Sequence, residues 1–213
     1  MERGTMADFN TAFERTMQFE GGYSSGESGD PGGETYRGIA RNSHPEWTGW
    51  LIIDAWKGYP GFPLTIDQYL KIELQRQVLS LYKNKYWAHI QGDAIKSNSV
   101  ANCLFDIAVN MGLTYAATSL QKALNAMNYN STTGKGFFNN LRIDGIIGGT
   151  TLAALNLILQ QGEENLLLTM INCERGQKFI TIANAFPERR KFLRGWMKRI
   201  RINLEGLNDN ISK

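Results

Sequence analysis

The sequence contains very few of the residues that build metal centres, disulfide frameworks and catalytic triads. Its 213 residues include two cysteines, Cys103 and Cys173, and two histidines, His44 and His89. Two cysteines are too few for a disulfide framework, and they lack the spacing of metal ligands. So few histidines also argue against a multi-histidine metal centre or a serine–histidine triad. We therefore expect chemistry based on carboxylates, and we expect two buried free thiols because both cysteines fall on apolar helical faces.

Long apolar runs are also missing. The longest, at 152–159 and 166–171, are far too short to span a bilayer. Residues 1–10 lack the apolar stretch of a signal peptide. We therefore expect synthesis in the cytoplasm without a signal peptide. With 42% hydrophobic and 20% charged residues, the composition is that of a globular protein. The length suits one large domain or two small lobes.

Positive charge is concentrated near the C-terminus. The net charge is +3, yet residues 188–201 contain seven basic residues and one acid. One interpretation is an anionic partner, such as an acidic polymer of the cell envelope. The alternative is a solvated helix face that docks through Phe192, Leu193 and Trp196. Nucleic acid is disfavoured because the aromatic residues are not interleaved as a stacking platform.

Helical spacing dominates the apolar pattern. Residues 21–38 break it with seven glycines and predict a loop or a tight hairpin. The class is therefore mainly α, with at most a small hairpin near residues 21–40. Asp8, Thr65 and Ser97 or Ser99 are expected helix caps. We expect helices over about 9–20, part of 45–57, 66–83, 97–111, 116–127, 150–159, 163–185 and 188–204.

Glu20 is the residue whose position conflicts most with local rules. It shares a helical face with Phe13 and Met17, the face expected to point inward. It also lies at the C-terminal end of its helix, where the macrodipole disfavours negative charge. Burial and the dipole both favour the neutral carboxylic acid, which is the form that a general acid requires. The alternative is a solvent-facing residue that ends the helix.

The loop after Glu20 supplies further polar groups. Asp30 follows ten residues later and Thr35 five residues after that. A protonated acid, an ionised carboxylate and a hydroxyl that orients water form a plausible glycoside hydrolase set. An inverting enzyme separates its two carboxyl groups by about 6.5–9.5 Å to admit that water. Glu27 and Glu34 are competing carboxylates, and a calcium loop is disfavoured because regular alternation of oxygen ligands is missing.

Several motifs occur in order along the chain. They are Phe19-Glu20-Gly21-Gly22-Tyr23, Asp30-Pro31-Gly32-Gly33-Glu34-Thr35, Gly38-Ile39, YKNKYW at 82–87, FDIAVNMG at 105–112, LQKAL at 120–124, IDGIIG at 143–148, LAAL at 152–155 and GWMKR at 195–199. Together these motifs resemble glycoside hydrolase family 108, the lysozyme-like N-acetylmuramidases, over about residues 7–201. Many members are encoded by phages and prophages as endolysins, and some are described as secretion activators.

The resemblance implies a lysozyme-like two-lobed fold. Residues 1–95 would form the N-terminal catalytic lobe and residues 96–213 the C-terminal helical lobe. The second lobe would include a peptidoglycan-binding segment at about 101–160 and the basic C-terminal helix. We expect it to be part of one fold and not an independent module. A monomer without metal, nucleotide or other cofactor is expected.

The resemblance also implies residue roles. Glu20 would donate a proton to the glycosidic oxygen, Asp30 would position or activate the water, and Thr35 would hold it. Apolar sugar faces pack on aromatic rings, so Tyr23, Tyr36 and Trp87 are candidates for binding substrate, although a tryptophan such as Trp87 is more often a core residue in a mainly α protein. Asn110, at a helix end, either reaches the cleft or caps the helix.

The expected activity is hydrolysis of the β-1,4 bond between N-acetylmuramic acid and N-acetylglucosamine in peptidoglycan. Access to the wall would require holin-type, specialised or lytic release. One alternative is a lytic transglycosylase, in which a single glutamate suffices. Another is a non-catalytic peptidoglycan-binding or secretion-assisting protein that keeps only the fold. The order of Glu20, Asp30 and Thr35 favours the hydrolase.

Overall fold

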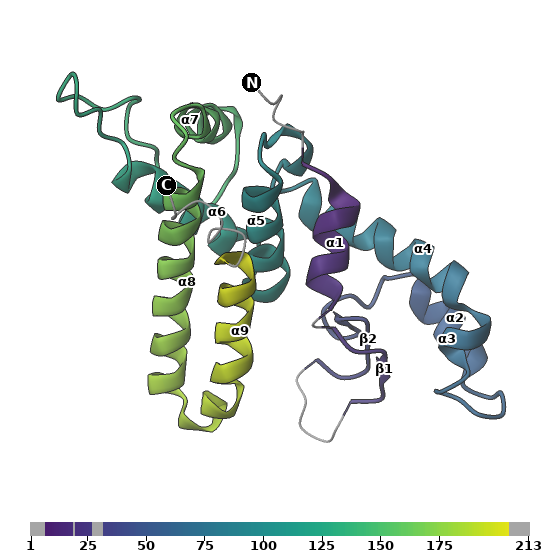
Figure 1. Cartoon of the computed structure of the whole chain (residues 1–213). Coiled ribbons are helices and arrows are strands. Elements are labelled where there is room, and N and C mark those ends of the chain that lie inside the picture. The colour runs from purple at the N-terminus through teal and green to yellow at the C-terminus, as the bar shows by residue number, and fades with distance from the viewer. Residues whose placement is uncertain (1–6, 19, 27–31, 205–213) are drawn as a thin grey trace.

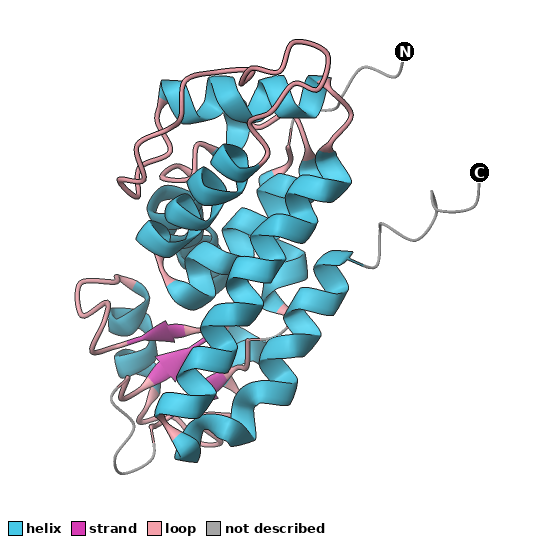
Figure 2. Cartoon of the chain, turned by 90° about the vertical axis from the view of Figure 1, so that its left-hand side faces the viewer, coloured by secondary structure: helices cyan, strands magenta, loops and turns pink. Residues whose placement is uncertain are grey.

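The computed structural model describes residues 7–18, 20–26 and 32–204, without the side chains of 67 and 202–204. The fold is mainly α with one small sheet, as the apolar pattern predicts (Figures 1 and 2). The α-helices are α1 (Phe9–Met17), α2 (Gly49–Trp56), α3 (Ile66–Tyr69), α4 (Lys71–Tyr82), α5 (Asn98–Met111), α6 (Leu113–Ala126), α7 (Gly149–Gln160), α8 (Glu164–Ala185) and α9 (Leu193–Leu204).

Two expected caps start helices in the structure. The Asp8 carboxylate accepts a hydrogen bond from the Thr11 amide at 2.8 Å, ahead of α1. The Ser97 hydroxyl accepts one from the Val100 amide at 3.0 Å, ahead of α5. Each cap satisfies an amide that has no partner within its helix. These caps define the first residues of the two helices that flank the site described below.

The glycine-rich segment forms three short antiparallel strands, one more than a hairpin needs. They are β1 (Tyr23–Ser24), β2 (Thr35–Tyr36) and β3 (Ile39–Ala40), in the order β1-β2-β3. Tyr36 is paired with both Tyr23 and Ile39. Arg37 and Gly38 join β2 to β3, with φ of 46° and 77°. Positive φ at both central residues matches the twist of a two-residue hairpin turn.

Helix boundaries differ from the predictions in four places. Helix α1 ends at Met17, three residues earlier than expected, and the Thr65 side chain makes no capping hydrogen bond ahead of α3. The helix expected over 66–83 is interrupted at Leu70, and η1 (Lys83–Trp87) continues it as a π-helix. Helix α6 begins directly after Gly112, three residues earlier than expected. The basic stretch begins with η3 (Pro187–Phe192), a 3₁₀-helix, because Pro187 cannot continue α8. A further 3₁₀ turn, η2, covers Gly92–Ala94.

The helices form two sides joined by a central pair. Figure 1 shows α8 and α9 as a paired column on one side and α2, α3 and α4 on the other, with α1 and α5 between them and the sheet below α1. The central core is aromatic, and the rings of Phe9, Trp87 and Phe105 meet edge to face.

The two cysteines differ in their surroundings. Cys103 is buried as expected, but the expectation for Cys173 is wrong because its residue lies on the exposed side of α8. Both thiols are free. Over residues 7–18, 20–26 and 32–204, no helix has the length and apolar character needed to cross a membrane.

Candidate active site

Glu20 lies just beyond the end of α1, against the turn between β2 and β3. Its amide donates to the Met17 carbonyl at 3.1 Å, and its side chain is 20% exposed. Gly38 has room for no side chain, since a Cβ there would lie 2.7 Å from Glu20 Oε2 and 2.7 Å from Tyr82 Oη. The carboxyl group is thus held at the surface of the sheet, partly open to solvent.

Tyr82 and Tyr86 lie close to the Glu20 carboxylate. The Tyr82 hydroxyl donates to the Arg37 carbonyl at 2.9 Å and thereby fixes the turn that contacts Glu20. Burial, and then the negative charge of Glu20, raise the pKa of both tyrosines above the ordinary value. Both phenols are therefore neutral near pH 7.

An arginine from the far end of the chain reaches Glu20. Arg199 Nη2 on α9 lies 2.9 Å from Glu20 Oε1, and its Nη1 lies 2.7 Å from Asp106 Oδ1 on α5. The other Asp106 oxygen accepts from Arg175 Nη2 on α8 at 2.6 Å. We call Glu20, Arg199, Asp106 and Arg175 the ion-pair chain. The expectation that Glu20 has apolar surroundings is wrong, because the guanidinium group of Arg199 contacts its carboxylate.

Burial makes the inner part of the ion-pair chain sensitive to loss of any member. The Arg175 side chain is fully buried and lies over the Phe179 ring at 5.5 Å. Its Nε and Nη1 atoms have no hydrogen-bond partner among the described residues. Asp106, at 7% exposure, is the carboxylate that balances both guanidinium groups. Buried charges are tolerated when they are paired in this way, so Asp106 holds Arg199 in position beside Glu20.

Thr35 lies on β2, two residues before the turn that contacts Glu20. It is half-buried, and its hydroxyl donates to the Gly33 carbonyl at 3.2 Å. Asp30 and Glu27 lie outside the described residues. The roles expected for Asp30 and Thr35 therefore stay predictions.

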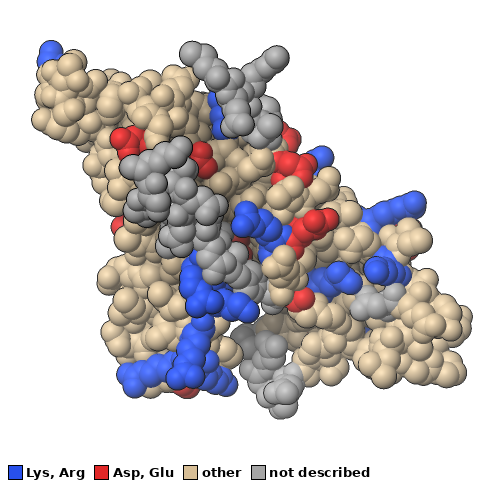
Figure 3. Space-filling view, viewed as in Figure 1, with Lys and Arg blue, Asp and Glu red and all other residues tan. Residues whose placement is uncertain are grey.

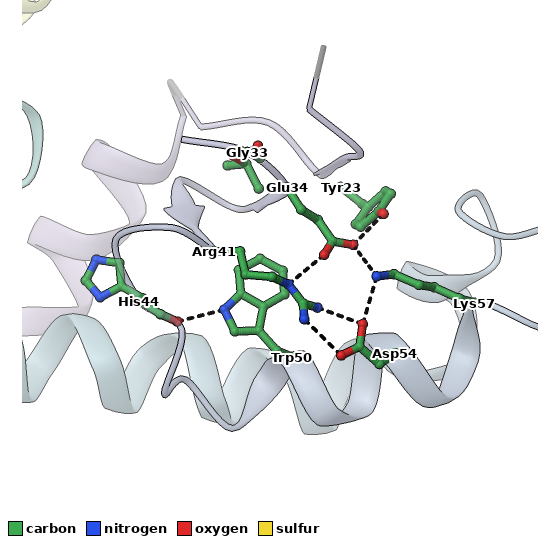
Figure 4. A network of polar contacts seen from close by, with 9 residues as sticks. Tyr23, Gly33, Glu34, Arg41, His44, Trp50, Asp54 and Lys57 are labelled. Atoms are coloured by element: carbon green, nitrogen blue, oxygen red, sulfur yellow. Dashed lines mark hydrogen bonds and ion pairs between the residues drawn. The ribbon is translucent and has the colours of Figure 1, made fainter. Parts of the chain in front are cut away.

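Glu34 is engaged in a separate network between the sheet segment and α2 (Figure 4). Its carboxylate contacts Arg41 Nε at 2.6 Å and Lys57 Nζ at 2.8 Å, and Asp54 on α2 pairs with the same two cations. The Tyr23 hydroxyl donates to Glu34 Oε1 at 2.5 Å. These contacts fasten the sheet to α2, so Glu34 competes poorly with Glu20 for a catalytic role.

Tyr23 is committed to this network, so its role in stacking on sugars stays a prediction. Burial and then the Glu34 carboxylate raise its pKa above the ordinary value. Its ring packs edge to face on Phe62, with centroids 4.7 Å apart.

Two expected substrate contacts are wrong because the side chains belong to the core. Tyr36 is 1% exposed and stacks on Trp47. Trp87 is also 1% exposed, and its indole N–H donates to Asp93 at 2.7 Å. Neither ring face is open to a sugar. Asn110 is exposed at the end of α5 and lines a cavity of about 630 Å³.

The pairing of Arg199 with Asp106 could have been suspected from the sequence, because each charged residue falls on an apolar helical face. Arg199 follows Trp196 by three residues and precedes Ile200, so it falls on the inward face of α9. Asp106 interrupts the buried run of α5. A charge on an apolar helical face needs a partner of opposite charge, and here each residue is the other's partner.

Two family models match most of the chain. Residues 13–112 match the family model described as glycosyl hydrolase 108, and residues 115–201 match the model described as predicted peptidoglycan domain. The chain contains a glycosyl hydrolase 108 domain. The enzyme is therefore a glycoside hydrolase, and peptidoglycan is its partner. Glu20 lies in the first matched segment and Arg199 in the second, so the ion-pair chain joins the two.

A solved structure supports the lysozyme-like fold over the whole chain. The structure of Brucella abortus SagA superimposes with a TM-score of 0.59 at 21% identity, covering 96% of each chain. No curated protein matches the sequence closely enough to extend the comparison. The mainly helical, lysozyme-like fold expected from the motifs is thus confirmed, and its division into two lobes stays a prediction.

Proposed function

We propose that this glycosyl hydrolase 108 protein is an N-acetylmuramidase. It cleaves the β-1,4 bond between N-acetylmuramic acid and N-acetylglucosamine, with Glu20 as general acid. The observation that carries the proposal is the partly exposed Glu20 carboxyl group, held between the sheet turn at Gly38 and Arg199 of the second matched segment. Among the carboxylates compared above, Asp106 is buried between two guanidinium groups and Glu34 is paired with two cations.

We propose separate roles for Glu20 and for the loop residues that follow it. The protonated Glu20 donates its proton to the glycosidic oxygen, and a water activated by Asp30 and held by Thr35 attacks the anomeric carbon and passes its proton to Asp30. Arg199 then stabilises the carboxylate that remains after proton transfer. Tyr82, a neutral donor bound to the Arg37 carbonyl, keeps the turn in place behind Glu20.

The proposal is tested by digesting purified peptidoglycan with wild type and with Glu20→Gln. The fragments are then analysed by mass spectrometry. We expect wild type to release reducing N-acetylmuramic acid ends and Glu20→Gln to release at least about a thousandfold less. Glu14→Gln is the matched control, because Glu14 lies on the exposed face of α1, the helix that precedes Glu20. It should cleave like wild type.

Two other results point to the alternative functions. Anhydro ends from wild type would identify a lytic transglycosylase. Binding to peptidoglycan without fragments, by a wild-type protein that is folded, would identify a non-catalytic binding or secretion-assisting protein.

We also infer that exposed cations near α9 attract anionic polymers of the envelope. Figure 3 shows lysine and arginine side chains gathered over α9 and around the end where α9 and α8 are connected. We call Lys191, Arg194 and Lys198 the basic column. All three are exposed, in contrast to Arg199 on the inward face of the same helix. Exposed charges of one sign raise the local concentration of an oppositely charged polymer.

A further inference from the structure

A second feature of the molecule, separate from the contacts of Glu20, is a cavity of about 630 Å³ in the helical lobe. The end of α5 and the start of α6 form one wall, and α8, η3 and α9 form the other. Its volume falls within the range of about 300–1,000 Å³ that is typical of small-molecule sites. The residues that matter to its chemistry are Asn110, Tyr115, Lys178, Phe179, Arg189 and Trp196.

The cavity lies one helical turn beyond the ion-pair chain on three helices at once. On α5, Asn110 follows Asp106 by four residues. On α8, Phe179 follows Arg175 by four residues, and on α9, which runs back toward the site, Trp196 precedes Arg199 by three. Three or four residues make about one turn, or 5.4 Å along each helix. The cavity is therefore adjacent to the groups that hold Glu20.

The lining combines positive charge with aromatic surface. Among the described residues that form it, Lys178 and Arg189 are cations and none is a carboxylate. Both cations are exposed; Lys178 lies over the Tyr115 ring at 6.0 Å, and Arg189 reaches the exposed carboxylate of Glu188 only at 3.8 Å.

The aromatic part of the lining is rigid. Trp196 stacks on Phe179 with ring centroids 5.1 Å apart and an angle of 19° between the planes. Phe179 is 2% exposed, so it supports Trp196 from behind, while Trp196 is half-buried. Two cations beside an apolar ring suit an anion that carries small apolar groups.

Peptidoglycan contains one component with that chemistry. Its N-acetylated sugar rings are neutral, whereas the stem peptide attached to each muramic acid carries free carboxylates and the methyl groups of alanine. We propose that the cavity binds the stem peptide, with Lys178 and Arg189 paired to its carboxylates and Trp196 packed against its apolar part. The proposal rests on the glycosidase function, because a glycan strand at Glu20 brings its stem peptide next to the cavity.

The test compares two substrates that differ only in the stem peptide. Purified glycan strands are digested with their stem peptides and again after an amidase has removed them, at one ionic strength because exposed charges are screened by salt. The quantity measured is the ratio of kcat/KM for peptide-bearing strands to kcat/KM for stripped strands. Lys178→Gln/Arg189→Gln is the test variant. Lys135→Gln/Arg142→Gln is the charge-matched control, since both of its residues are exposed and lie outside the cavity.

We expect the ratio to fall about tenfold or more in the test variant and to remain at the wild-type value in the control. Equal losses on both substrates, or no loss, would overturn the proposal. If kcat/KM of the test variant falls only on sacculi that retain a phosphate-rich polymer, the proposal is overturned, because the cavity then binds that polymer and not the stem peptide.

Binding of a soluble muramyl peptide, measured by calorimetry, separates this proposal from the proposed function. Wild type should bind it, and the test variant should bind about tenfold more weakly. If wild type binds the peptide but cleaves neither substrate, the N-acetylmuramidase assignment fails and the cavity assignment stands. If wild type cleaves both substrates equally well and binds no peptide, the reverse holds.

Discussion

Glu20 owes its position to a residue without a side chain. Gly38 has a positive φ of 77°, and both the Glu20 carboxyl group and the Tyr82 hydroxyl occupy the space that a Cβ would need. A glycine is thus required here twice, once for the hairpin turn and once for the approach of the carboxyl group.

Gly38→Ala should therefore damage both stability and activity. The positive φ alone costs about 1 kcal/mol for alanine, and the clash adds to it by displacing Glu20 or Tyr82. We expect a further loss of about 1–2 kcal/mol and at least about a tenfold drop in peptidoglycan cleavage. Denaturant unfolding and a turbidity assay on sacculi measure the two effects.

Gly134→Ala is the control for backbone strain. Its φ is 67°, yet a Cβ there meets nothing within 4 Å. It should lose about 1 kcal/mol and no activity. Equal effects of the two substitutions would show that contact with Glu20 does not matter.

At the scale of elements, the ion-pair chain fastens four segments to one another. The end of α1, α5, α8 and α9 each contribute one charged side chain, and Asp106 on α5 is central to them. The network of Glu34, Arg41, Asp54 and Lys57 performs a similar task between the sheet and α2, but nearer to solvent. The two networks should therefore differ in how much each contributes to stability.

Asp106→Asn should be strongly destabilising. It removes the carboxylate that pairs with the buried guanidinium groups of Arg175 and Arg199, and removal of one partner of a buried pair costs about 3–5 kcal/mol. Asp54→Asn removes a carboxylate that is 43% exposed and should cost no more than about 1 kcal/mol. Urea unfolding of the two variants checks the order, and similar losses would contradict it.

The Asp54 network should also give stability a defined dependence on pH. Hydrogen bonds from Arg41 and Lys57 lower the pKa of Asp54 to about 2. Because the folded state favours the ionised form, the stabilisation is full above the unfolded pKa of about 3.9 and is lost as the pH falls toward 2.

The difference in unfolding free energy between wild type and Asp54→Asn should therefore shrink as the pH falls from 5 to 2. Urea titrations across this range measure it. A difference that stays constant would show that Asp54 acts through packing and not through its charge.

In the whole molecule, the two faces of α9 have different surroundings. Its inward face supplies Arg199 to Glu20, while its outward face carries Arg194 and Lys198 of the basic column and Lys191 lies on the preceding η3. The segment that matches the peptidoglycan domain thus contributes a side chain that contacts Glu20 in the glycosidase segment.

Neutralising the basic column should weaken attachment to the wall in a salt-dependent manner. We expect Lys191→Gln/Arg194→Gln/Lys198→Gln to bind sacculi several-fold more weakly at low salt and almost like wild type at about 0.5 M salt. Pelleting with sacculi measures binding. Lys71→Gln/Arg76→Gln/Lys135→Gln removes the same charge from exposed positions elsewhere, and an equal loss in that variant would assign the effect to net charge alone.

The features that depend on residues close together in the sequence could be predicted from the sequence alone. Helix periodicity, the caps at Asp8 and Ser97 and the glycine-rich sheet segment all arise from contacts within a few residues, and each was predictable. The family motifs likewise singled out Glu20, although its role stays a prediction.

Which distant side chains meet depends on how the helices pack. Arg199 contacts Glu20 across 179 residues of sequence, and local patterns placed it in a solvated basic stretch. Tyr36 and Trp87 were both candidates for binding sugars, with the core favoured for Trp87, and the packing of Trp47, Phe9 and Phe105 covers both rings. The physical reason is the same in both cases, because burial and ion pairing depend on how whole helices pack against one another.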